Sequence, residues 1–257
     1  MVRGLYTAYT GMINQQKRLD TITNNLANAS TTGFKREGAT SRAFNEMLTV
    51  KVNDRTTGYI TQKIGNMSLG VKIGENYTDY TQGSFRATEN TYDVAIEGNG
   101  FFSISFTNKG GEQSIMYTRD GEFTIDSDGM LRTKDGDYVQ GEGGDIAIPT
   151  DATSIAITTT GEIYADGELV DRLQIVDFED YNYLKKYGEN MYKTVDGANE
   201  IESRALLHQG YLEASNINVV NEMVQMITIS RAYESSQKAV QTADSMIEKA
   251  VNEVGRV

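Results

Sequence analysis

Cysteine, tryptophan, histidine and proline are almost absent from this chain of 257 residues. It has no Cys, no Trp, one His (His208) and one Pro (Pro149). Without Cys, disulfides and Cys-ligated zinc or iron–sulfur centres are excluded. A single His also excludes histidine-rich metal sites and catalysis by a pair of histidines. We therefore expect no metal centre of these kinds.

Long apolar runs are also missing. No run of about 18 apolar residues occurs, so no transmembrane helix is expected. Residues 1–18 lack the apolar core of a secretory signal peptide. Taken alone, this favours a cytoplasmic protein, but it leaves open an export route that needs no cleaved signal.

The chain is acidic, with 24 Lys and Arg against 36 Asp and Glu and a net charge of −12. The excess lies in residues 75–200, which carry nine basic and 25 acidic residues. Residues 1–43 carry six and two, residues 44–74 four and two, and residues 201–257 five and seven. The net charge argues against general binding of nucleic acid or anionic membranes. Its uneven distribution indicates two kinds of structure in one chain.

Apolar residues spaced seven apart predict a long helix at each end of the chain. The first is expected over residues 3–28 and carries Leu5, Met12, Leu19 and Leu26. The second is expected from about 218 to 254 and carries Val219, Met226, Tyr233, Val240, Ile247 and Val254. Ser215 and Asn216 are its candidate caps, and Gly255 is its expected end. We expect the two helices to pair as a coiled coil; two core helices of one globular domain are the alternative.

Short strands are predicted between the helices. Asp-Gly turn signals occur at 120–121, 128–129 and 135–136, with apolar residues between them. An apolar-rich strand over 92–106 is interrupted at Gly98–Gly100, and further strands are expected near 146–148, 154–158, 162–164, 168–169 and 173–178. This spacing predicts a sandwich or an irregular barrel. The predicted fold class is α+β, mainly β, with a discontinuous two-part architecture.

These patterns divide the chain into four segments. Residues 1–35 are the first helix and turn, 36–80 an extended connector, 81–208 a central all-β domain, and 209–257 the helix that pairs with the first segment. A connector this long without structure would be unusual in a compact domain, so we expect neighbouring subunits to order it. QGSFRATEN (82–90) resembles QGYLEASN (209–216), and we interpret these stretches as paired hinges at Gln82, Gly83, Gln209 and Gly210.

No residue pattern indicates an enzyme. His208 beside a Gln-Gly pair is more typical of a structural residue, and Glu97 has no second carboxylate at a motif-like spacing. Gly98–Gly100 is too short for a dinucleotide fingerprint. Asp126–Gly129 lacks the spacing of a calcium-binding loop and is interpreted as an acidic turn. We therefore expect no catalytic, cofactor-binding or metal-ligating residues, and no nucleic acid or small-molecule substrate.

Four blocks of the sequence carry a resemblance to a known family. The blocks are NNLANASTTGFK (24–35) with GLYTAYTGMINQQKRLD before it, TQGSFRATENTYDVAIEGNGFF (81–102), YTRDGEFTIDSDGML (117–131) and the stretch over 210–250 that begins GYLEASN. In this order they resemble the bacterial flagellar axial proteins of the rod and hook group. The length leaves no room for the additional outer β domain of hook proteins. The length therefore favours a rod protein. The C-terminal RAYE…KAV and the connector over 36–80 most resemble the distal rod type, with the proximal rod type second and the hook type as a further alternative.

The resemblance implies a structural subunit of the flagellar basal body without catalytic activity. It implies export without a cleaved signal through the flagellar type III apparatus, to a place in the cell envelope outside the cytoplasm. It implies assembly into a hollow helical tube that transmits motor torque and conducts exported subunits. The implied partners are other copies of the chain, neighbouring rod proteins, the hook protein, the export apparatus and the bushing-ring proteins.

The resemblance also suggests roles for particular residues. The apolar heptad residues of both helices, Leu5 to Leu26 and Val219 to Val254 as given above, would form the inner packing layer of the tube. The turn out of the first helix would be formed by Asn24, Asn25, Asn28, Gly33 and Phe34. The rival hypothesis is a secreted β-domain binding module oligomerised by its terminal helices, with a candidate ligand cluster at Tyr181, Tyr183, Tyr187 and Tyr192.

Overall fold

The computed structural model describes residues 2–51, 62–108 and 110–254, and its contacts divide the chain into two units. Unit 1 comprises Met1–Ala27, Glu37–Asp79 and Asn218–Val257, and unit 2 comprises Asn28–Arg36 and Tyr80–Ile217. The acidity belongs to unit 2, which contains 12 Lys and Arg against 25 Asp and Glu. Both units are discontinuous in sequence, so each one needs chain segments from both ends.

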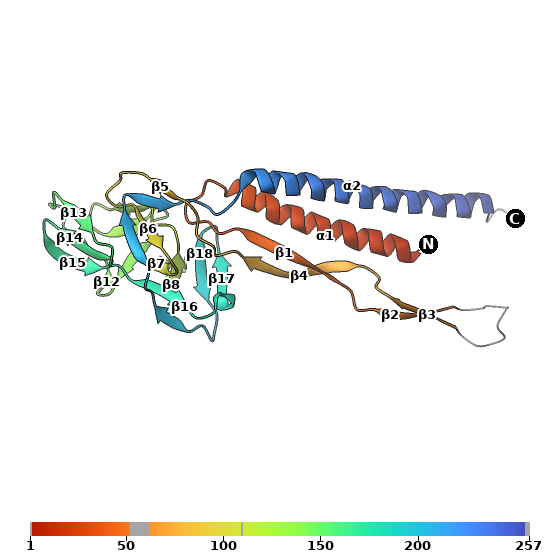
Figure 1. Cartoon of the computed structure of the whole chain (residues 1–257), viewed down its shortest axis with the longest axis horizontal. Helices are drawn as coiled ribbons and strands as arrows, with labels where there is room; N and C mark the ends of the chain where they lie inside the picture. Colours follow the sequence, from red (N-terminus) through yellow and green to blue (C-terminus); the bar gives the residue numbers. More distant parts are fainter. Residues whose placement is uncertain (1, 52–61, 109, 255–257) are drawn as a thin grey trace. The chain divides into compact units, whose positions relative to one another are not determined.

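Unit 1 contains two long helices, as the heptad pattern predicts. α1 (Val2–Ala27) and α2 (Val219–Lys249) lie side by side and run in opposite directions (Figure 1). α2 continues into a π-helical turn, η2 (Ala250–Val254). Among the helices in the described residues, none is both long enough and apolar enough to span a bilayer. A helix at each end of the chain is thus confirmed.

The predicted caps of the second helix are wrong by two to three residues. Asn218 is the N-cap, and its side chain accepts a hydrogen bond of 3.1 Å from the backbone N–H of Asn221. Asn216 cannot fill this role because its side chain bonds to Arg36 and Thr81 instead. The predicted end at Gly255 lies outside the described residues.

The predicted extended connector, residues 36–80, contains two antiparallel ribbons in its described part. β1 (Glu37–Ala43) pairs with β4 (Val71–Thr78), and β2 (Met47–Lys51) pairs with β3 (Gln62–Met67). Polar side chains of α1 bind the first strand. Asn14 Nδ2 donates to Ser41 Oγ at 2.9 Å, and Asn25 exchanges two hydrogen bonds with the backbone of Glu37. The Asn residues of the first helix therefore attach it to this ribbon.

Unit 2 is built from short antiparallel strands. Its ten-stranded sheet has the order β17-β18-β8-β7-β11-β10-β9, with β12 beside β11, β16 beside β7 and β19 beside β16. These strands are β7 (Phe101–Thr107), β8 (Gln113–Thr118), β9 (Phe123–Ile125), β10 (Leu131–Thr133), β11 (Tyr138–Gly141), β12 (Gly144–Asp145), β16 (Ile175–Phe178), β17 (Leu184–Tyr187), β18 (Met191–Thr194) and β19 (Glu200–Glu202).

Three smaller sheets complete the unit. They are formed by β13 (Ile155–Ile157), β14 (Glu162–Ala165) and β15 (Glu168–Arg172), by β6 (Val94–Glu97) with β20 (Leu206–Gln209), and by β5 (Phe85–Ala87) with β21 (Tyr211–Glu213). A 3₁₀ turn, η1 (Tyr181–Tyr183), precedes β17. Within the described residues no strand pairing joins the ends of the large sheet, β17 and β9. The barrel alternative is therefore wrong, and the chain is mainly β with a helix at each end.

The core of unit 2 has two buried clusters that share strand β7. Consecutive side chains of a strand point to opposite faces. Phe102 accordingly belongs to one cluster, which includes Val94, Ile96, Phe123, Leu131, Val139, Ile146, Ile163 and Leu207. Phe101 belongs to the other, with Tyr117, Val176, Phe178, Leu184 and Tyr192. The predicted break of the 92–106 strand at Gly98–Gly100 is confirmed, because β6 ends at Glu97 and β7 begins at Phe101.

Candidate functional site

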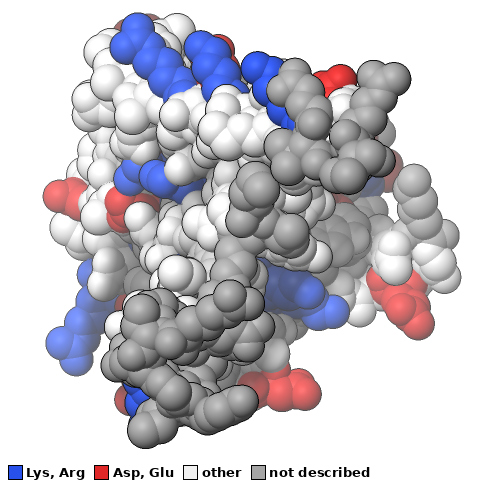
Figure 2. Space-filling view, turned by 90° about the vertical axis from the view of Figure 1, so that its right-hand side faces the viewer, with Lys and Arg blue, Asp and Glu red and all other residues white. Residues whose placement is uncertain are grey.

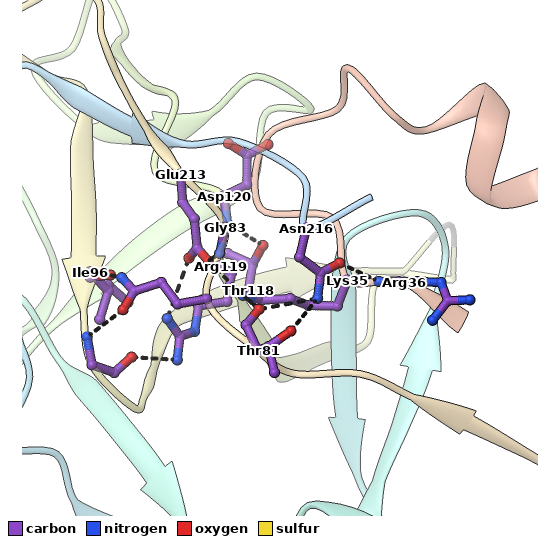
Figure 3. A network of polar contacts seen from close by, with 12 residues as sticks. Lys35, Arg36, Thr81, Gly83, Ile96, Thr118, Arg119, Asp120, Glu213 and Asn216 are labelled. Atoms are coloured by element: carbon purple, nitrogen blue, oxygen red, sulfur yellow. Dashed lines mark hydrogen bonds and ion pairs between the residues drawn. The ribbon is translucent and has the colours of Figure 1, made fainter. Parts of the chain in front are cut away.

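Four segments that are far apart in sequence meet at the carboxylate of Glu213 in unit 2 (Figure 3). Lys35 Nζ lies 2.5 Å from Oε1, Arg119 Nη1 lies 3.3 Å from Oε2, and the backbone N–H of Gly83 donates to Oε1 at 2.8 Å. The exposed fractions of the Glu213, Lys35 and Arg119 side chains are 0%, 1% and 3%. We call these four residues, Lys35, Gly83, Arg119 and Glu213, the Glu213 junction.

Close backbone packing around the junction requires glycine at positions 33 and 83. Glu213 ends β21 and pairs with Phe85 of β5, and its carbonyl accepts a 2.8 Å hydrogen bond from Gly33 N–H. Gly33 has φ +66°, and a Cβ there would lie 2.5 Å from the backbone carbon of Arg119. At Gly83 a Cβ would lie 1.9 Å from the carbonyl oxygen of Ala214. No larger residue fits at either position, because the crossing chain segments touch there.

The two cations of the junction are also bound to backbone carbonyls. Lys35 Nζ donates to Thr81 O at 2.9 Å, and Arg119 Nη2 donates to Gly98 O at 2.8 Å. The guanidinium of Arg119 also lies 5.2 Å from the ring centroid of Phe101. Buried charges are tolerated only when they are paired and hydrogen-bonded in this way. The junction therefore depends on all three charged side chains together.

The predicted hinge residues lie in hydrogen-bonded positions of unit 2. Gln82 Nε2 donates to Ile96 O at 2.7 Å, and Gln209 Nε2 donates to Thr91 O at 2.8 Å. Gly210 has φ +77°, and its carbonyl accepts from Thr88 N–H at 2.9 Å. These bonds fix the two similar stretches locally. Whether they act as hinges stays a prediction.

Asp120 is a second buried acid near the junction. Its carboxylate accepts hydrogen bonds of 2.7 Å from both Thr32 Oγ1 and Asn190 Nδ2, and one of 3.1 Å from the backbone N–H of Glu122. Burial raises the pKa of Asp120, and this effect outweighs the hydrogen bonds that lower it. Thr32 thus ties the segment after α1 to the turn before β9.

Asp120→Asn is expected to flatten the pH dependence of stability. The contribution of Asp120 to the free energy of unfolding is full below its ordinary pKa of about 3.9. It is lost as the pH rises through the raised folded pKa, because the unfolded chain releases the proton first. Urea unfolding of both proteins from pH 4 upward checks this, with the exposed Asp128→Asn as control. A parallel decline in wild type and variant would contradict it.

The predicted inner-layer residues are mostly half-buried within unit 1. Leu5, Met12, Leu19, Leu26, Met226, Tyr233, Val240 and Ile247 are all of intermediate exposure, whereas Val219 is 40% exposed. The side chain of Val254 lies outside the described residues. The fully buried helix positions are Asn14, Ile22, Asn25, Glu222 and Ile229. None of these five is one of the predicted heptad residues. The polar Asn25 and Glu222 are tolerated in the interior because their side chains form a hydrogen bond of 3.3 Å.

The predicted turn residues lie in both units. Asn24 and Asn25 belong to α1, where Asn24 is exposed and Asn25 is buried. Asn28, Gly33 and Phe34 belong to unit 2 and are buried. The carbonyl of Asn28 accepts from Thr31 N–H at 3.2 Å. Lys186 Nζ lies 3.9 Å above the ring of Phe34, so the turn is packed onto β17.

The residues considered for ligand or metal chemistry do not form one site. The side chain of Tyr192 is wholly buried in the core, so the tyrosine cluster is not an exposed platform. His208 Nε2 lies 2.5 Å from Glu97 Oε2 on the surface. Asp126 forms a turn, with Gly129 N–H donating to its carbonyl, and pairs with Arg132 at 2.8 Å. Over the described ranges, no three His, Asp or Glu side chains are grouped to hold a metal ion.

The exposed apolar side chains of unit 1 include two groups, one on α2 and one on a ribbon. α2 carries an apolar stripe with i, i+3, i+4 and i+7 spacing, which consists of the exposed Val220, Met223, Val224 and Ile227. The ribbon β2–β3 exposes Met47, Leu48, Ile64 and Met67. Basic and acidic side chains are interspersed on the face in Figure 2. Contiguous exposed apolar surface is typical of interaction sites.

Comparisons with known proteins identify relatives along almost the whole chain. Family models match at residues 5–35 (flagella basal body rod protein), 95–165 (flagellar hook protein FlgE/F/G D1 domain) and 208–253 (flagellar basal body rod FlgEFG protein C-terminal). The chain is 36% identical to the flagellar basal-body rod protein FlgG of Agrobacterium fabrum, with 95% of this chain and 97% of the relative aligned. It is 35% identical to FlgG of Borreliella burgdorferi (98% and 98%) and 34% identical to FlgG of Bacillus subtilis (98% and 99%).

Proposed function

The chain belongs to the family of flagellar basal-body rod proteins, and from this we propose that its copies polymerise into the hollow helical tube of the distal rod. It is a structural subunit of the flagellum that assembles with other rod and hook proteins, and it is not an enzyme. As distal rod, the tube transmits torque from the motor to the hook and conducts exported subunits. The distal type is supported by the FlgG relatives rather than by any single residue.

The observation that carries polymerisation is the apolar surface that unit 1 leaves exposed. The stripe Val220, Met223, Val224 and Ile227 faces solvent, and most of the heptad residues are only half-buried. Burying apolar area contributes about 25 cal/mol per Å². We propose that α1 and α2 pair as a coiled coil and that neighbouring copies cover this surface. A contact between two different surfaces of adjacent copies generates a helical polymer when its rotation does not close into a ring, and we propose this non-closing case.

The remaining assignments of the function follow from family membership. We propose that the helices within residues 1–35 and 209–257 form the inner layer, residues 81–208 the outer domain, and residues 36–80 a lock between neighbouring copies. The exposed Met47 and Ile64 of the ribbon β2–β3 support the lock. We also propose export through the flagellar type III apparatus without a cleaved signal, to a position in the envelope outside the cytoplasm. The further partners proposed are the export apparatus and the bushing-ring proteins.

Limited proteolysis of the purified full-length chain tests this function. The terminal helices are expected to be digested in dilute solution, because helices stabilised by tertiary packing are loose without their neighbours. A resistant core containing 80–217 is expected to survive. The peptide carrying Lys35 is expected to stay bound to it even after cleavage within 37–79, because Lys35 pairs with the buried Glu213. Fragments are identified by native and denaturing mass spectrometry.

The proteolysis result distinguishes the rod subunit from the secreted β-domain binding module. Resistance of both termini in dilute solution would contradict the open polymer and favour the closed oligomer of a secreted binding module. That module would also need an exposed aromatic ligand groove. The burial of Tyr192 removes one of its four candidate residues.

A further inference from the structure

The turn between β6 and β7 contains Asn99, the one asparagine of the sequence that is followed by glycine. We propose that Asn99 is a site of spontaneous deamidation, at which its side-chain amide is lost through a cyclic imide formed with the backbone of Gly100. Glycine favours this reaction because it has no Cβ to hinder its own backbone nitrogen and because its backbone dihedrals are the least restricted. The inference does not depend on polymerisation.

The Asn99 side chain is exposed, Gly100 is buried, and both reacting groups at this turn are unengaged. Among the described residues, neither the side-chain amide of Asn99 nor the Gly100 N–H has a hydrogen-bond partner. Two of the asparagines with bonded side chains, Asn25 and Asn216, differ in this respect. The Asn25 side chain is bonded to Glu37, and the Asn216 side chain to Arg36 and Thr81. Those amides must first break hydrogen bonds, whereas the amide of Asn99 is free to react.

Packing favours glycine at position 100, the residue that makes the Asn99–Gly100 pair reactive. Gly100 has φ +138°, and a Cβ there would lie 2.6 Å from Ser203 Oγ and 2.9 Å from Ile175 Cγ2. Real Cβ contacts essentially never come that close. A side chain at position 100 would therefore be strained, whereas a change at position 99 removes the susceptibility without this strain.

The reaction consumes one water and releases one ammonia. The Gly100 nitrogen loses its proton and attacks Cγ of Asn99. The N–Cγ bond forms, the Cγ–Nδ2 bond breaks, and Nδ2 takes up one proton and leaves as ammonia, which gives a five-membered succinimide. A solvent water then opens one of the two ring carbonyls. Opening at one carbonyl gives aspartate with the original backbone, and opening at the other gives isoaspartate, whose main chain runs through Cβ. Both products gain one negative charge, and no oxidation or reduction occurs.

The products differ in what they do to the fold. The turn is attached on both sides of Asn99: the Gly98 carbonyl accepts from Arg119 at 2.8 Å, and the Asn99 carbonyl accepts from Ser203 Oγ at 2.5 Å. Isoaspartate adds one carbon to the backbone just before β7. The longer backbone then cannot keep both hydrogen bonds and also leave Phe101 in its buried position. Isoaspartate is therefore expected to weaken the Arg119 contact, whereas aspartate leaves the backbone unchanged.

The test is ageing of the purified full-length chain at physiological temperature and mildly alkaline pH, where the backbone nitrogen loses its proton more readily. Peptide mapping with a fragmentation that distinguishes aspartate from isoaspartate gives the rate at each asparagine. Asn99 is expected to react at least about tenfold faster than any other asparagine, equivalent to about 1.4 kcal/mol in the activation barrier. Asn99→Gln is the matched control and is expected to slow the reaction, because it would need a six-membered ring.

Two results would overturn the proposal. One is conversion of Asn99 only in urea-unfolded chain, while the native chain stays intact. The other is an even rate over all asparagines. Asn99→Asp separates the products: aged wild type is expected to unfold at lower urea than Asn99→Asp. Equal midpoints, with isoaspartate present in the aged sample, would contradict the claim that the altered backbone disturbs β7.

Discussion

Glu213→Gln is expected to lower the free energy of unfolding by about 3–5 kcal/mol, the usual cost of removing one partner from a buried ion pair. The substitution keeps the size of the side chain but leaves the buried cations of Lys35 and Arg119 without a counter-charge. The measurement is urea unfolding of the full-length chain, followed by the near-ultraviolet signal of the buried tyrosines Tyr117 and Tyr192.

A matched control comes from an exposed ion pair of the same chain. Glu142 pairs with Arg172 at 3.0 Å, with side chains 61% and 43% exposed. Glu142→Gln is expected to cost less than about 1 kcal/mol, because exposed pairs are weak. The double variant Lys35→Met, Glu213→Gln is expected to lose less than the sum of the single losses, since the two residues interact directly. Equal losses for Glu213→Gln and Glu142→Gln would show that the junction contributes no more than a surface pair.

Ile247→Asp is expected to abolish rod assembly and motility while leaving unit 2 folded. Ile247 lies in α2 at a half-buried heptad position, and α2 belongs to unit 1. A carboxylate in an apolar interface between copies carries a desolvation cost of several kcal/mol, and each subunit of the polymer repeats it. The readouts are motility in soft agar, electron microscopy of isolated basal bodies, and urea unfolding of the purified variant.

The control for this variant is Gln241→Asp, which adds the same charge at an exposed position of the same helix. It is expected to retain motility. Normal motility of a strain carrying Ile247→Asp would contradict the proposed role of Ile247 in the inner layer. Loss of the unfolding transition of unit 2 in purified Ile247→Asp would also contradict the prediction, because it would locate the defect in folding rather than in assembly.

Local patterns in the sequence were sufficient for the elements that depend on nearby residues. The helices α1 and α2 follow from apolar residues recurring every seven positions, and the hairpin β9–β10 follows from its Asp128-Gly129 turn. The break before β7 follows from two glycines with positive φ, at positions 98 and 100. In each case the residues that determine the element are within a few positions of one another. A local sequence pattern is therefore enough to predict the element.

The cap of α2 and the ribbons of residues 37–79 could not be read in this way. Asn216 and Asn218 are the same residue type, so by sequence alone they are equally suitable N-caps. The structure uses Asn218 because Asn216 is engaged by Arg36 and Thr81, which are distant in sequence. The ribbon strands β1 and β4 are rich in polar residues, and β1 carries no alternating pattern. They are ordered partly by Asn14 and Asn25 of α1, which the sequence does not bring near them.

The sequence by itself determined that the chain has two terminal helices around a β-rich, acidic middle, and its four motif blocks determined the family. Only the tertiary structure shows the physical role of particular residues in those blocks. Lys35, Gly83, Arg119 and Glu213 come from the four different blocks and meet at one buried carboxylate. A charge is tolerated in the interior only next to its partner, and partners 178 residues apart are matched by folding, not by any local pattern.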